Sequence, residues 1–113
     1  MSTRAQVYIK GSKTYLYQHY DGDGLFDIIY KAINSKEGIA VRDEEEYTGR
    51  VLFEAMLAQA HPTMPKSQGY GIGSEKHGDI EFLVVVDCEK GVIIEKENIM
   101  DKWVIKRKYS WGS

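Results

Sequence analysis

The stretch YLYQHYDGDGLFDIIYKAI, from Tyr15 to Ile33, decides the fold, because its apolar residues change their period halfway along. The part up to Tyr20 is rich in tyrosine and alternates as a half-buried strand does. From Leu25 onward the apolar residues recur at intervals of three and four, which is typical of an amphipathic helix. The DGDG run between the two parts favours a tight turn, with Asp23 placed to cap the helix. The stretch therefore predicts a strand, a turn and a helix in succession.

Around this stretch, strands gather at the two ends of the chain and helices in its middle. An earlier strand, at residues 5–11, forms a hairpin with the run ending at Tyr20. A second helix begins at Asp43 and stops before Pro62. Asp43 and Glu46 have the spacing of a capping box, and Arg50 and Glu54 have the spacing of an ion pair on one helix face. Further strands are expected at residues 80–87, 92–97 and 102–108, and a short one around 70–73 is an option. The pattern predicts a single α+β domain over residues 1–113, with two helices packed on one face of a mostly antiparallel sheet of five or six strands, in the order ββααβββ.

Length and composition predict a small protein that folds without disulfide bonds. At 113 residues the chain can bury a core of its own, and its single cysteine, Cys88, excludes an internal disulfide. Cys88 has no helix N-terminus or cluster of cations beside it in the sequence, so we do not expect a nucleophile there. The first ten residues lack the apolar run of a secretory signal, and no apolar run reaches the roughly 20 residues that cross a membrane. We therefore expect a cytoplasmic protein.

The net charge is small, but the charged residues are unevenly placed. A net charge of −2 argues against a strong general affinity for nucleic acid. The run DKWVIKRKYSW, at residues 101–111, nevertheless combines basic and aromatic side chains, which together can follow a phosphate backbone and stack on bases. Lysines on an edge strand also discourage sheets from pairing with one another, and we prefer this interpretation.

Histidine and aspartate gather where the strand ends. His19, Asp21 and Asp23 stand at alternate positions, and an imidazole beside carboxylates suits zinc, manganese or iron. An EF-hand calcium loop is excluded, because Leu25 and Ala32 occupy positions where it needs oxygen ligands. A turn and a helix cap would account for both aspartates but leave His19 unexplained. His19 is therefore a candidate site residue.

A second group of the same kind, His77, Asp79 and Glu81, stands at the start of the strand expected at 80–87. If that strand pairs antiparallel with the one ending at Tyr20, the two groups lie at the same end of the sheet. Two histidines and two aspartates would then converge, either as a metal site or as an acid and base pair, with two solvent-facing turns as the alternative. The candidate metal ligands are His19, Asp21, His77 and Asp79.

The connection from Pro62 to His77 is long for a compact domain and rich in glycine. Its GYGIGS run is no dinucleotide fingerprint, because it follows a loop and precedes a strand. Connections of this length are often binding loops, and Tyr70 at its centre is a candidate contact residue. A glycine-rich hairpin or edge strand is the alternative interpretation.

The runs LYQHYDG, at residues 16–22, and HGDIEFLVVVD, at 77–87, resemble motifs of a set of small proteins encoded by bacteriophages and other mobile elements. Those proteins have a leucine-tyrosine-x-histidine-aromatic-aspartate-glycine run early and a glycine-aspartate-x-glutamate-aromatic strand late. The chain departs from them at Asp23-Gly24, where they usually have Tyr-Pro. The resemblance implies an accessory protein that interferes with a host function or defence system, and it nominates His19, Asp21, Asp79 and Glu81.

Three functions fit these features. The preferred one is a non-enzymatic protein, without a cofactor, that binds and inhibits or sequesters a host protein or a small nucleotide ligand. Its expected contact residues are Tyr17, His19, Asp21, Tyr70, His77, Asp79 and Glu81. The second helix is apolar on nearly all sides, which suggests association with another copy of the chain. The alternatives are a divalent-metal hydrolase or nuclease built on the four candidate ligands, and a single-stranded nucleic-acid binder that uses the C-terminal strand with Tyr15 and Tyr17.

Overall fold

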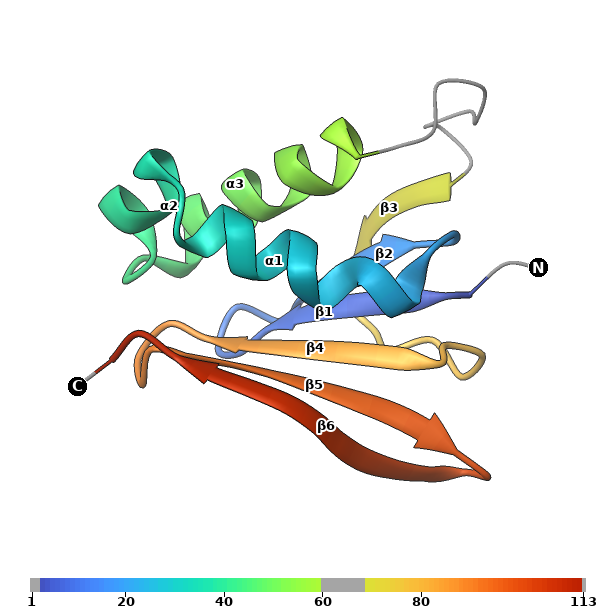
Figure 1. Ribbon diagram of the computed structural model, residues 1–113. Coiled ribbons are helices and arrows are strands. Elements are labelled where there is room, and N and C mark those ends of the chain that lie inside the picture. Colours follow the sequence, from blue (N-terminus) through green and yellow to red (C-terminus); the bar gives the residue numbers. More distant parts are fainter. Residues whose placement is uncertain (1–2, 60–68, 113) are drawn as a thin grey trace.

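The computed structural model describes residues 3–59 and 69–112, which form six strands and three α-helices (Figure 1). The strands are β1 (Ala5–Ile9), β2 (Thr14–Gln18), β3 (Tyr70–Gly73), β4 (Phe82–Asp87), β5 (Val92–Ile99) and β6 (Lys102–Ser110). The helices are α1 (Leu25–Ile33), α2 (Lys36–Val41) and α3 (Glu45–Ala58), and a short 3-10 turn, η1 (Gly22–Gly24), precedes α1. No helix in these two ranges is long and apolar enough to cross a membrane.

The strands form one sheet in the order β3-β2-β1-β4-β5-β6, antiparallel except for the parallel pair of β1 and β4. The predicted α+β class and mostly antiparallel sheet are confirmed. The predicted order ββααβββ omits α2 and also β3, which had been an option only. α2 is six residues long and contains Gly38, so it shows no helical period. It begins because Ser35 Oγ accepts a hydrogen bond from the Gly38 N–H at 3.0 Å.

The predicted pairing of β2 with β4 is wrong, because β1 lies between them. Ala5, at the start of β1, stands opposite Gln18 at the end of β2 and Phe82 at the start of β4. Four of the five residues of β1 are buried, which suits a strand that has neighbouring strands on both sides. The end of β2 and the start of β4 therefore still lie at one end of the sheet, one strand apart.

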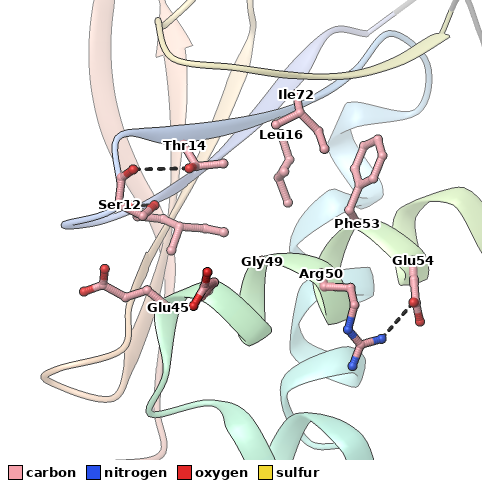
Figure 2. A pocket seen from close by; sticks show the side chains of 11 residues that line it. Ser12, Thr14, Leu16, Glu45, Gly49, Arg50, Phe53, Glu54 and Ile72 are labelled. Atoms are coloured by element: carbon pink, nitrogen blue, oxygen red, sulfur yellow. Dashed lines mark hydrogen bonds and ion pairs between the residues drawn. The ribbon is translucent and has the colours of Figure 1, made fainter.

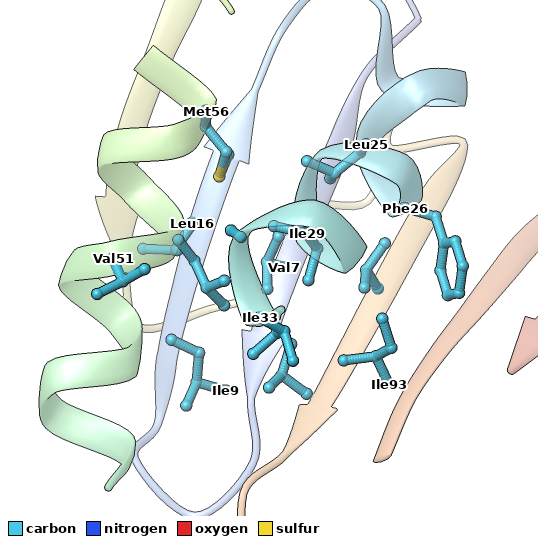
Figure 3. Close-up of a cluster of buried hydrophobic side chains, with 14 of the residues drawn as sticks. Val7, Ile9, Leu16, Leu25, Phe26, Ile29, Ile33, Val51, Met56 and Ile93 are labelled. Atoms are coloured by element: carbon cyan, nitrogen blue, oxygen red, sulfur yellow. The ribbon is translucent and has the colours of Figure 1, made fainter. Parts of the chain in front are cut away.

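All three helices lie on one side of the sheet (Figure 1), and α1 and α3 share a buried apolar cluster with it (Figure 3). Because side chains alternate along a strand, every second residue of the central strands points into this core. The buried strand residues are Ala5, Val7, Ile9, Leu16, Val84, Val86 and Ile93. The helices contribute Leu25, Ile29, Ile33, Val51, Leu52 and Met56.

The other side of the sheet, which we call the open face, carries the alternate residues of the same strands. No described helix covers it (Figure 1). The connection between β3 and β4 crosses one end of it, where the Gln6 side chain donates to the Glu75 carbonyl at 3.1 Å and accepts from the His77 N–H at 2.8 Å. On β3 the residues of this face are Gly71 and Gly73, and a Cβ on either would meet nothing within 4 Å. The open face is therefore accessible at the centre of the sheet and at its β3 edge.

Candidate ligand-binding face

The open face is hollowed by a cavity of about 530 Å³, which we call the lysine basin. It is lined by Tyr8, Lys10, Tyr15, Lys76, Leu83, Val85, Asp87, Lys90, Val92, Ile94, Lys96 and Lys108. The apolar and tyrosine side chains come from alternate positions of β1, β2, β4 and β5. The five lysines come from separate parts of the chain, so the strand order alone brings them together.

Positive charge outweighs negative charge in the lysine basin, with five lysines against one carboxylate, that of Asp87. The Asp87 carboxylate accepts the backbone N–H of Lys90 at 2.9 Å and lies 3.6 Å from Lys10 Nζ. The hydrogen bond from Lys90, with Lys10 beside it, holds the pKa of Asp87 below its usual value. Within the described residues, none of the other four basin lysines forms an ion pair. The basin therefore offers several ammonium groups to an anion.

Two tyrosines stack on each other at one side of the basin. Tyr8 and Tyr15 are opposite each other in the β1–β2 ladder, with ring centroids 4.7 Å apart and ring planes 22° apart. Burial raises the pKa of Tyr15, so the side chain is a neutral phenol near pH 7. Its neighbour on β3 is Gly73, which has no side chain. The outer side of the pair is therefore open to a flat ring.

Beside the basin, at the end of the sheet, five side chains meet in what we call the histidine cluster: Arg4, Tyr17, His19, His77 and Asp79. Tyr17 Oη lies 2.9 Å from His19 Nδ1, and the Tyr17 and His77 ring centroids are 4.7 Å apart. Arg4 Nε donates to His19 Nδ1 at 3.4 Å, and Arg4 Nη1 donates to Asp79 Oδ2 at 2.9 Å. Arg4 thus links β2 to the connection that precedes β4.

The contact with Arg4 favours one tautomer of His19. Because an arginine can only donate, His19 Nδ1 is the acceptor of this contact, which suits the tautomer that has its hydrogen on Nε2. Burial, followed by the charge of Asp79, raises the pKa of Tyr17 and keeps it a neutral phenol. Among the described residues, no carboxylate bonds to His19 or His77 to orient it as a general base. The cluster therefore offers aromatic rings and hydrogen-bonding groups to a ligand.

The remaining predicted contact residues lie outside the cluster. Asp21 is an exposed turn residue with a φ of 56°. Tyr70 packs against the core on the helix side of the sheet, where burial and then Asp21 raise its pKa. Glu81 is exposed before β4, and its N–H donates to the Arg4 carbonyl at 2.8 Å. Residues 62–68 of the predicted binding loop lie outside the described residues. The structure brings together Tyr17, His19, His77 and Asp79, and leaves Asp21, Tyr70 and Glu81 apart.

The four candidate metal ligands do not assemble. In residues 3–59 and 69–112, no group of three or more histidine, cysteine, aspartate or glutamate side chains is placed to hold a metal ion. Arg4 already engages both His19 Nδ1 and Asp79. The described residues therefore show no assembled ligand set for the hydrolase alternative, and a metal site at His19, Asp21, His77 and Asp79 stays a prediction.

Sequence reasoning missed the lysine basin and Arg4. The available signal was alternation: VIIEKE and KRK each place a lysine on the face opposite the core, at Lys96 and Lys108. The basic and aromatic C-terminal segment is the edge strand β6, as predicted. Its Trp103 lies under Lys76, whose Nζ is 4.9 Å from the indole ring centroid.

Comparisons with protein-family models, with curated proteins and with solved structures find no match. Function therefore has to be inferred from the chemistry of the open face. That face joins a cationic cavity, a stacked tyrosine pair and a histidine cluster in one continuous surface.

Proposed function

We propose that this chain is a non-enzymatic binding protein that captures a small nucleotide on its open face and sequesters it in the cytoplasm of a host cell. The lysine basin carries the proposal, because it concentrates five lysines around an apolar and aromatic floor in a chain of net charge −2. The phage-type accessory role implied by the two motifs is compatible with sequestration and stays a prediction.

The basin suits both halves of a nucleotide. Its volume of about 530 Å³ falls in the range of about 300–1,000 Å³ that is usual for small-molecule sites. Lys96 and Lys108 stand on neighbouring strands and offer point charges to phosphate oxygens. The pair of Tyr8 and Tyr15 offers a stacking surface to the base. Such stacking accepts any of the bases, because every base has a π-face.

The histidine cluster extends the same surface. Tyr17 follows Tyr15 on the same face of β2, and the His77 ring lies beside it, tilted by 40°. The Nε2–H of the favoured His19 tautomer would donate a hydrogen bond to a base or a sugar. These groups would select a ligand without altering it.

Single-stranded nucleic acid is the second candidate. Trp103 and Lys108 of β6 lie on the same face as Tyr15, so a longer chain could continue from the basin across the edge of the sheet. The net charge of −2 weighs against this candidate, because a polymer also meets the acidic surface beyond the basin.

Calorimetric titration with ATP, AMP, adenosine and tripolyphosphate separates the contributions of base and phosphate. We expect ATP to bind most tightly and adenosine most weakly, with affinity falling as salt is added. Lys96→Gln and Lys108→Gln should each weaken ATP binding about tenfold, or about 1.4 kcal/mol. Lys31→Gln, on α1 and away from the open face, is the matched control and should change nothing.

Two outcomes would overturn the nucleotide proposal. One is no ATP binding at low salt, and the other is an equal loss of affinity in Lys31→Gln. A labelled oligothymidine that binds far more tightly than ATP, and loses affinity when Trp103 is replaced by leucine, would favour the nucleic-acid candidate.

A further inference from the structure

A second cavity of about 530 Å³ lies on the helix side of the sheet, between α3 and the edge formed by β2 and β3 (Figure 2). We call it the edge cleft. Leu16, Phe53 and Ile72 line its apolar part, and Ile72 is 64% exposed. Its lip carries three carboxylates: Glu45, Glu46 and Glu54. An exposed isoleucine at the mouth of an apolar cavity marks a contact surface.

The strand beside the cleft, β3, is four residues long and is the outermost strand of the sheet. The His19 N–H donates to the Gly69 carbonyl at 2.8 Å, and this pairing continues at every second residue of an antiparallel ladder. Gly71 and Gly73 therefore direct their backbone groups toward β2. Tyr70 and Ile72 direct theirs outward, where no described strand pairs with them. β3 thus presents hydrogen-bonding groups to a further strand.

The charge at the lip is unevenly compensated. Arg50 donates to Glu54 at 2.8 Å and to Glu37 at 2.9 Å, so it is engaged twice. Within the described residues neither Glu45 nor Glu46 forms an ion pair. The lip therefore favours a cationic side chain.

We propose that β3 accepts an extended segment of a partner protein as an added strand. Side chains alternate along such a segment, so an apolar residue would pack beside Ile72 against Phe53. A lysine or arginine two residues further along the segment lies on the same face and would reach Glu45 or Glu46 at the lip. This surface is on the opposite side of the sheet from the lysine basin, and its use does not depend on nucleotide capture.

A synthetic peptide that repeats Val-Thr-Lys-Thr, in which valine and lysine lie on the same face of the added strand, is the direct probe when labelled for fluorescence anisotropy. We expect it to bind, and a valine and glutamate peptide of the same length to bind at least tenfold more weakly. A third peptide keeps the valine and lysine side chains but carries N-methyl groups on alternate amides. It should lose most of the affinity, because an added strand is held by main-chain hydrogen bonds.

Two isoleucines on opposite edges of the sheet form a matched pair of variants. Ile72 on β3 is 64% exposed and Ile105 on β6 is 61% exposed, and threonine suits a strand at either position. Ile72→Thr should weaken peptide binding about fivefold or more, whereas Ile105→Thr should leave it unchanged. Glu45→Gln in the wild-type chain should also weaken peptide binding and should make that binding less dependent on salt.

The proposal is overturned if the valine and lysine peptide does not bind, if the N-methylated peptide binds equally well, or if both isoleucine variants behave alike. Light scattering tests the remaining possibility, that a second copy of this chain occupies the β3 edge. A dimer that both Ile72→Thr and Ile105→Thr dissociate would show that β6 of a second copy, and not a partner segment, takes this edge.

Discussion

At the scale of single residues, the two glycines of the DGDG run have different roles. The Gly22 N–H donates to the Thr3 carbonyl at 2.8 Å, and a Cβ on Gly22 would lie 2.6 Å from the same oxygen. Gly24 is the N-cap of α1, with open space around it and no side-chain cap bond. The turn was predictable from its residue types, but the predicted cap at Asp23 was wrong. Gly22 is required because the Thr3 carbonyl lies so close to it. Thr3 is distant in the sequence, so no local pattern predicts this contact.

Gly22→Ala should therefore destabilise the protein by about 1–3 kcal/mol, as overpacking against backbone does. Gly24→Ala is the control two residues away, and it should be neutral or stabilising by up to about 1 kcal/mol, because its φ of −96° suits alanine. Urea unfolding followed by circular dichroism measures both. Equal free energies of unfolding for the two variants would show that the contact with Thr3 is not close.

Asp87 makes stability depend on pH at the acid end. Folding lowers its pKa, so its contribution is fully present above the unfolded value of about 3.9 and is lost as pH falls through the folded value. Asp87→Asn can still accept the Lys90 N–H but carries no charge. We expect this variant to melt below the wild type near pH 6, with the gap closing as the pH falls through the folded pKa of Asp87. A gap that stays constant over this pH range would contradict the assignment.

At the scale of elements, the spacing of apolar residues predicted the two longer helices, α1 and α3. The order of the strands in the sheet depends instead on contacts between distant segments. α1 and α3 have many apolar residues at helical spacing, and the Arg50–Glu54 pair expected from that spacing forms at 2.8 Å. The capping box expected at Asp43 and Glu46 is absent, since the N-cap is Glu44 without a side-chain bond. The place of β1 between β2 and β4 depends on a parallel pairing across most of the chain, which neither strand's own sequence specifies.

The edge strand β6 is fixed to the rest of the molecule by Arg107. Its guanidinium donates to both oxygens of Glu95, at 2.9 and 3.2 Å, and to Asp27 of α1 at 3.0 Å. Glu95 is only 2% exposed. Arg107→Leu leaves that carboxylate buried without a partner and should cost about 3 kcal/mol, the low end for a buried pair because Arg107 itself is partly exposed.

The neighbouring lysine provides the control for this prediction. Lys106 pairs with Glu97 at 3.1 Å in a more exposed position, so Lys106→Leu should cost less than about 1 kcal/mol. Replacing Glu95 by glutamine in the Arg107→Leu background should recover part of the loss, since the charge is then gone. Chemical denaturation of the three variants tests the order. Equal costs for Arg107→Leu and Lys106→Leu would mean that the buried pair of Arg107 and Glu95 holds β6 no more strongly than a surface ion pair does.

At the scale of the whole molecule, the site was predictable only in part. The sequence predicted that His19, Asp21, His77 and Asp79 converge at one end of the sheet. His19, His77 and Asp79 do meet there, although through Arg4, Tyr17 and an intervening strand, and Asp21 lies apart. The lysine basin could not be predicted from the sequence. No local pattern marks any of its lysines, and their proximity follows from the strand order. Local patterns therefore identified candidate side chains, and topology decided which of them share a surface.

The same topology implies that the lysine basin lowers stability. Several like charges around an apolar floor repel one another, and the repulsion is strongest when little salt screens it. Replacing both Lys96 and Lys108 by glutamine should therefore raise the melting temperature by about 1–3 °C at low ionic strength, from a few tenths of a kcal/mol per relieved contact. The gain should largely disappear in high salt, and Lys31→Gln on α1 should show neither effect. Calorimetric melts at two salt concentrations measure this without any ligand. A lower melting temperature for the double variant, or a gain that salt leaves unchanged, would mean that the basin is not a concentrated positive field, and the open face would then have no electrostatic reason to attract phosphate.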